Sequence, residues 1–91
     1  MNYNNVNLKL KPKVHITEMG KNLIVFDEAS GEFFRVDEIG TCIITSISKQ
    51  IPIQQMIKNI TEQHDIEHNE AENDVNSFLG SLYQNDLLDI G

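Results

Sequence analysis

The sequence predicts an α+β domain of winged-helix type, in which a three-stranded antiparallel sheet is followed by three helices. Residues 13–36 read as short strands separated by turn residues. After Asp37 the apolar residues recur three and four positions apart, as they do in helices. The chain has 91 residues, enough for one small domain. We expect the Asn-rich residues 1–12 to be a flexible N-terminal segment and residues 13–91 to form that single domain.

The strands are predicted in chain order. Residues 13–18 alternate apolar and polar side chains, which is typical of a half-buried strand. Residues 23–27 begin with a continuous apolar run and predict a central strand covered on both faces. Residues 32–36 follow a turn at Gly31 and form the third strand. Short turns between consecutive strands favour an antiparallel meander.

The first two helices follow from cap and breaker residues. Asp37 is a good N-cap for the first helix, and Gly40 in its first turn indicates a close approach of another segment to the backbone. Pro52 suits the first turn of the second helix. The residues expected to face the core are Ile39, Ile43, Ile44, Ile47, Ile53, Met56, Ile57 and Ile60.

The third helix is predicted from Asn69 to about Asn85. Asn69 and Glu72 have the spacing of a capping box. Apolar residues at 75, 78, 79 and 82 then form one helical face. The apolar residues at 87, 88 and 90 are expected to close the core.

The charge distribution argues against nucleic-acid binding. The whole net charge of −7 lies in residues 50–91, where Lys58 is the one basic residue against eight acidic ones. Such a surface repels phosphate backbones, and a recognition helix would need Lys or Arg, which residues 69–88 lack. The acidity favours a basic partner, although it also serves solubility.

The remaining composition predicts a cytoplasmic protein without a membrane partner. The single Cys42 forms no internal disulfide, and no apolar run approaches the length that spans a membrane. The polar N-terminus lacks the pattern of a signal peptide.

No pattern in the sequence indicates catalysis, a metal or a cofactor. His64 and His68 have zinc-ligand spacing, but they straddle a predicted helix break, and neither a second Cys nor a suitably placed third His accompanies them. Cys42 lies in an apolar helix and His15 in a strand, and no Gly-rich phosphate loop is present. We therefore expect a binding protein rather than an enzyme.

The order of elements suggests what is bound. A hairpin followed by a C-terminal amphipathic helix can leave a groove between the sheet edge and the helix, and an extended peptide suits such a groove.

Two segments resemble the PqqD family of RiPP recognition elements, which bind precursor peptides. Residues 33–37, with Gly40, are similar to the family's aromatic-aromatic-Arg-apolar-Asn segment with its Gly three residues on. Residues 74–82, with Leu87 and Leu88, match the family's late Asp-Val-x-x-Phe-Leu-x-x-Leu motif and its Leu-Leu pair. Asp37 replaces the usual Asn, and Ile44 stands where many members linked to lasso peptides have Trp.

The resemblance implies that the leader segment of a precursor peptide adds as a strand to the third strand, beneath the third helix. The implied peptide-binding residues are Phe33, Phe34, Arg35, Val36, Asp74, Ser77, Phe78, Ser81 and Leu82. Phe78 and Leu82 are expected to serve both core and groove, whereas Val75 and Leu79 are expected to pack in the core.

The resemblance also implies partners. The favoured setting is a lasso-peptide pathway, in which the chain presents its peptide to a leader peptidase and then a cyclase. The alternative within the class is a radical-SAM enzyme of pyrroloquinoline quinone or sactipeptide biosynthesis. Two alternatives of other classes are a winged-helix transcription regulator and a structural subunit whose groove is permanently filled by another protein.

Overall fold

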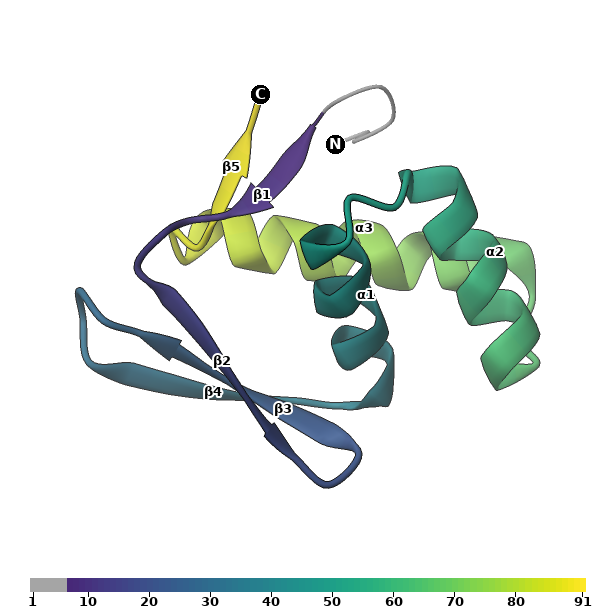
Figure 1. Cartoon of the computed structure of the whole chain (residues 1–91). Coiled ribbons are helices and arrows are strands. Elements are labelled where there is room, and N and C mark those ends of the chain that lie inside the picture. The colour runs from purple at the N-terminus through teal and green to yellow at the C-terminus, as the bar shows by residue number, and fades with distance from the viewer. Residues whose placement is uncertain (1–6) are drawn as a thin grey trace.

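The computed structural model describes residues 7–91 and confirms the predicted α+β architecture (Figure 1). Strands β2 (Val14–Met19), β3 (Asn22–Asp27) and β4 (Glu32–Val36) form an antiparallel sheet in the order β2-β3-β4. Helices α1 (Glu38–Ser48), α2 (Ile53–His64) and α3 (His68–Gln84) follow and lie on one side of that sheet. No helix in residues 7–91 is long and apolar enough to cross a membrane.

The hairpin between β3 and β4 is stabilised by the side chain of Asp27. Its carboxylate accepts hydrogen bonds from the Ala29 N–H and the Ser30 hydroxyl, both at 3.0 Å, and contacts the Lys13 ammonium at 3.4 Å. Burial by itself would raise the pKa of Asp27, but these three donors outweigh it and hold the pKa below its usual 3.8. Gly31, at φ +77°, completes the turn in a conformation that favours glycine.

The two faces of the sheet differ, which corrects one expectation. The inward side chains of β3, Leu23 and Val25, are buried at 5% and 2% exposure. Ile24 and Phe26 point to the other face and are only half-buried, because no helix covers that side. The prediction that this strand is covered on both faces was therefore wrong, since a continuous apolar run does not report which side the helices take.

Helix α1 begins as the sequence predicted. Asp37 is its N-cap, and the Asp37 carboxylate accepts a hydrogen bond from the Gly40 N–H at 2.8 Å. Ile43, Ile44 and Ile47 are buried in the core, whereas Ile39 is half-buried at the helix start.

The N-cap of helix α3 lies two residues earlier than the predicted Asn69, and the helix begins without the capping box. Its N-cap is Glu67, which makes no side-chain cap hydrogen bond, and Asn69 already lies inside the helix. The spacing of Asn69 and Glu72 matches the capping-box motif. The N-cap, however, is the residue with extended backbone angles just before the helix, and that residue is Glu67.

Two short strands were missed by the sequence analysis. β1 (Leu8–Leu10) pairs antiparallel with β5 (Leu88–Ile90), so the expectation of a flexible segment fails at Leu8–Leu10. Beside β1, Asn7 exchanges backbone hydrogen bonds with Gly91, and the Lys11 N–H donates to the Leu87 carbonyl. Residues 1–6 of the expected flexible segment lie outside the described part of the chain. Strands this short give too little periodicity to be recognised, and their pairing joins residues some 80 positions apart.

Ion pairs reinforce this joining of the two ends. The Lys11 ammonium lies 2.6 Å from the Asp86 carboxylate, and that of Lys13 lies 3.3 Å from it. The hydrogen bond between Lys11 and Asp86 is the largest cause that raises the pKa of Lys11 and lowers that of Asp86. These ion pairs therefore hold the N-terminal segment against the end of α3.

Candidate functional site

Strand β4 is an edge of the sheet, because it pairs only with β3 among the residues that the structure describes. Glu28, just after β3, donates its N–H to the Lys13 carbonyl on the β2 side. Backbone groups alternate in direction along a strand, so the register directs those of Phe34 to β3. Phe33 and Arg35 then direct their N–H and C=O groups to the open side. This edge can accept another strand.

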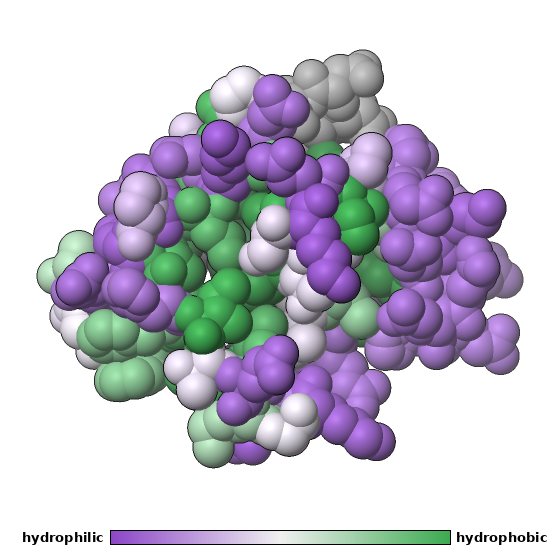
Figure 2. Space-filling model, viewed as in Figure 1, coloured by the Kyte–Doolittle hydropathy of each residue, from purple (hydrophilic) through white to green (hydrophobic). Residues whose placement is uncertain are grey.

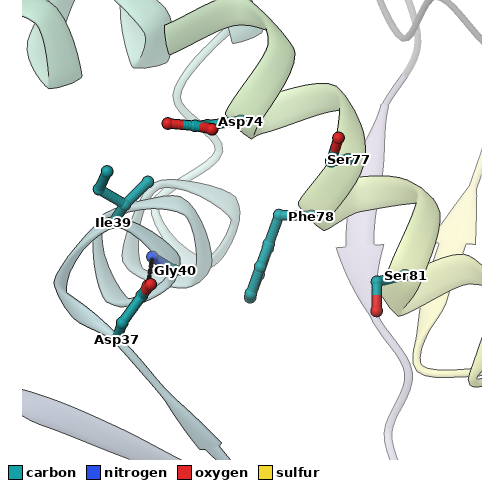
Figure 3. A pocket seen from close by; sticks show the side chains of 7 residues that line it. All are labelled: Asp37, Ile39, Gly40, Asp74, Ser77, Phe78 and Ser81. Atoms are coloured by element: carbon teal, nitrogen blue, oxygen red, sulfur yellow. Dashed lines mark hydrogen bonds between the residues drawn. The ribbon is translucent and has the colours of Figure 1, made fainter. Parts of the chain in front are cut away.

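A pocket of about 340 Å³ lies where β4 ends and α1 begins. Its walls come from the start of α1 and from one side of α3 (Figure 3). The lining residues are Asp37, Ile39, Gly40, Asp74, Ser77, Phe78 and Ser81. Since Asp37 directly follows β4, the pocket adjoins the end of this edge strand.

Gly40 lets the two walls approach closely, as the sequence predicted. A Cβ atom at Gly40 would lie 2.8 Å from a ring carbon of Phe78 and would also collide with Val36. The Phe78 side chain projects from α3 into the space beside the start of α1 (Figure 3). The bare backbone at Gly40 therefore determines how deeply Phe78 sits.

Helix α3 presents two different faces. Ala71, Val75 and Leu79 are fully buried, and Leu82 is 6% exposed. The adjacent face carries Asp74, Ser77, Phe78 and Ser81 along the pocket (Figure 3). The positions 74, 77, 78 and 81 are three or four apart, as one helical face requires.

The structure brings together four of the predicted peptide-binding residues and separates the others. Asp74, Ser77, Phe78 and Ser81 all line the pocket. Leu82 and Val36 lie in the core instead. Phe34 is half-buried against the core, on the helix side of the sheet.

The side chains of Phe33 and Arg35 face away from the helices. Phe33 is 70% exposed and stacks on Phe26, with ring centroids 4.6 Å apart. Only the backbone groups of Phe33 and Arg35 are therefore placed at the open edge.

Three pocket residues were not among the predicted site residues: Asp37, Ile39 and Gly40. Asp37 and Gly40 were recognised from the sequence, but as a helix cap and a close approach. The signal that would have found them is their position directly after the edge strand.

The surface around this region is mixed in character. Figure 2 shows apolar side chains exposed at the middle of the viewed face, between the strands and the helices, whereas the surface over α2 is hydrophilic. An exposed apolar centre with a polar surround is typical of an interaction site.

Cys42 and His64 lie near each other, away from the pocket. The Cys42 sulfur is 3.8 Å from His64 Nε2 and 3.3 Å from Gln63 Oε1. Burial is the main cause that raises the pKa of the Cys42 thiol, and the Glu38 carboxylate adds to it, which disfavours the thiolate. Within residues 7–91, no three His, Cys, Asp or Glu side chains are grouped to hold a metal ion.

Comparison with known proteins identifies a family for this chain. Residues 22–88 match the family described as "Coenzyme PQQ synthesis protein D (PqqD)". A search of curated proteins gives no match.

Two solved structures share the fold. One is "TbiB1 in Complex with the TbiA(beta) Leader Peptide", with a TM-score of 0.83 and 18% identity over 89% of this chain and 94% of that chain. The other is "Lasso peptide synthetase B1 complexed with the leader peptide", with a TM-score of 0.84 and 18% identity over 91% of this chain and 98% of that chain.

Proposed function

This chain belongs to the PqqD family, and from that premise we propose that it binds the leader segment of a ribosomally made precursor peptide as an added strand on β4. The two structures of the same fold are complexes of other proteins with leader peptides, which supports this proposal. The family match covers β3, β4 and all three helices, and so includes every element that forms the edge and the pocket.

One observation carries the proposal: the open edge of β4 runs directly into the pocket between α1 and α3. A peptide paired with Phe33 and Arg35 gains main-chain hydrogen bonds that do not depend on its sequence. Where it passes the end of β4, its side chains meet Phe78 and Ile39 and gain sequence preference there. Phe34 and Val36 support this surface from the core.

The chain acts by binding, in the cytosol where such precursors are made, and presents the peptide to a separate modifying enzyme. A lasso-peptide pathway with a leader peptidase and a cyclase is the favoured setting, supported by the shared fold of a lasso peptide synthetase B1. The alternative is a radical-SAM partner in pyrroloquinoline quinone or sactipeptide biosynthesis, and the family description supports the first of these two. The genes beside this one distinguish the two settings.

Proline substitutions test the added strand. Phe33→Pro deletes an N–H on the open edge of β4, which a strand edge tolerates structurally. We expect it to abolish binding of a fluorescent leader peptide, taken from the precursor gene beside this one, in an anisotropy titration. Phe34→Pro deletes a bond to β3 and is expected to destabilise the fold instead.

The matched control lies on the other edge of the same sheet. By the same alternation, Ile16 in β2 directs its N–H away from β3. Ile16→Pro therefore makes the same change at an open edge remote from the pocket, and leader affinity is expected to stay at the wild-type value. Folded Phe33→Pro protein that binds the leader as tightly as Ile16→Pro would refute strand addition to β4.

A further inference from the structure

The charge of the pocket indicates which leader residue it selects. Resting on the proposed function, we propose that the pocket binds a lysine or arginine side chain of the leader. The aliphatic stem lies against Phe78 and Ile39, and the cation is bound by Asp74 and Asp37.

The pocket combines two carboxylates with no basic lining residue among those that the structure describes. The Asp74 carboxylate makes no hydrogen bond or ion pair with any described residue. One oxygen of Asp37 accepts the Gly40 N–H, and the other has no described partner. Both carboxylates line the same pocket, so its negative charge attracts a cationic side chain.

Several acidic residues make no ion pair with a described residue, but among them only Asp37 and Asp74 line the pocket. Lys11 and Lys13 already contact Asp27, Asp86 and Asp89, and His15 contacts Glu28. Those carboxylates serve the fold, because they tie the chain ends and the hairpin together. The two in the pocket have no such partner and remain available to a ligand.

The apolar walls suit the stem of a long basic side chain. Ile39 and Phe78 are each half-buried, on opposite sides of the pocket, and Asp37 and Asp74 lie on either side of Ile39 (Figure 3). Lys and Arg bury their methylene stems against apolar surface while the charged end stays at a polar rim. The face of Phe78 adds attraction for the cation. A volume of about 340 Å³ is ample for one such side chain.

The position of the pocket indicates where in the leader the bound Lys or Arg lies. Asp37 follows the last residue of β4, so the basic residue lies just beyond the segment of the leader that pairs with Phe33 and Arg35. A preference for Lys or Arg therefore appears at one fixed distance from the paired segment, rather than as a general attraction of basic peptides to an acidic protein.

Peptide selection tests this without knowledge of the natural leader. The probe is a phage-displayed library of random dodecapeptides, selected on the whole chain. We expect Lys or Arg to be enriched at one position of the bound peptides. Replacing that Lys by norleucine in a synthetic peptide keeps the stem, removes the charge, and is expected to weaken binding by about threefold to tenfold.

Isosteric variants assign the effect to the pocket. Asp74→Asn and Asp37→Asn remove one charge each, and Asn keeps the helix cap at position 37. In either variant the norleucine penalty is expected to shrink. Glu70→Gln is the matched control, since it removes the same charge from an exposed position of α3 outside the pocket, and there the full penalty is expected.

The outcomes separate this inference from the proposed function. Selected peptides that lose binding to Phe33→Pro need the β4 edge. If these peptides share no basic residue, strand addition to β4 is left intact but the inference is overturned. A norleucine penalty equal in Asp74→Asn, Asp37→Asn and Glu70→Gln would overturn it too. If the library yields no binder, or binders indifferent to Phe33→Pro, the proposed function itself fails.

Discussion

The two faces of α3 show how one helix serves both the fold and the site. The core face, with Val75, Leu79 and Leu82, is buried by packing against the rest of the domain. The pocket face differs in that Phe78 lies among Asp74, Ser77 and Ser81 and is only half-buried. Apolar surface that folding leaves uncovered on Phe78 can be buried when a peptide binds. We therefore expect substitutions on the core face to change mainly stability and substitutions on the pocket face to change mainly peptide affinity.

The largest expected effect is on the core face, at Leu82. Leu82→Ala removes a buried side chain that does not line the pocket, and about 2–5 kcal/mol of unfolding free energy is expected to be lost. Urea unfolding followed by circular dichroism measures this loss. At a temperature where the variant is folded, leader affinity measured by anisotropy should equal that of wild type. A large affinity loss in folded protein would show that the two faces are not separable.

The next effect is on the pocket face, at Phe78. Phe78→Ala is expected to cost about 2 kcal/mol of stability, below the 3–5 kcal/mol typical of a fully buried Phe, because the ring is half-buried. Leader affinity is expected to fall by about tenfold or more, since the ring forms the apolar wall. Comparing affinity and unfolding of Phe78→Ala with those of Leu82→Ala separates binding from folding. Equal affinity in the two variants would place the peptide elsewhere.

Periodicity and caps were enough to predict most of this fold. The core side chains of α1 and α2 follow the 3.6-residue repeat, and Asp37 caps α1 as expected. The misses have physical reasons. β1 and β5 exist through a pairing between distant parts of the chain, and the start of α3 depends on the backbone angles of Glu67.

The pocket was only half predictable for a related reason. The family resemblance implied Asp74, Ser77, Phe78 and Ser81 as site residues, and all four line the pocket. It also gave Phe78 and Leu82 the same dual role, although Leu82 does not line the pocket. Leu82 falls on the stripe of Val75 and Leu79, which becomes clear only when the direction of the core is known. Asp37, Ile39 and Gly40 join the site through tertiary structure, because α1 places them opposite α3.

The smallest expected effect is at the end of α3, where Asp86 ties the helix to the N-terminal segment. Because Lys11 lowers the pKa of Asp86 in the folded protein, the pair stabilises the fold fully above the usual carboxyl pKa of 3.8. That contribution is lost as the pH falls through the lowered pKa. Likewise, the pKa of Lys11 is raised above 10.5, so its part is complete below that value and is lost as the pH rises through the raised pKa.

Asp86→Asn should therefore lower the unfolding midpoint near pH 7, and the difference from wild type should shrink as the pH falls through the lowered pKa of Asp86. Thermal unfolding followed by circular dichroism across this range measures the difference. Asp65→Asn is the matched control, since Asp65 also follows a helix with a positive φ of 51°, against 60° at Asp86, but makes no ion pair with a described residue. An equal shift of the midpoint in both variants would mean that the substitution acts through the backbone of the helix end, and that Lys11 does not stabilise the closure beside α3.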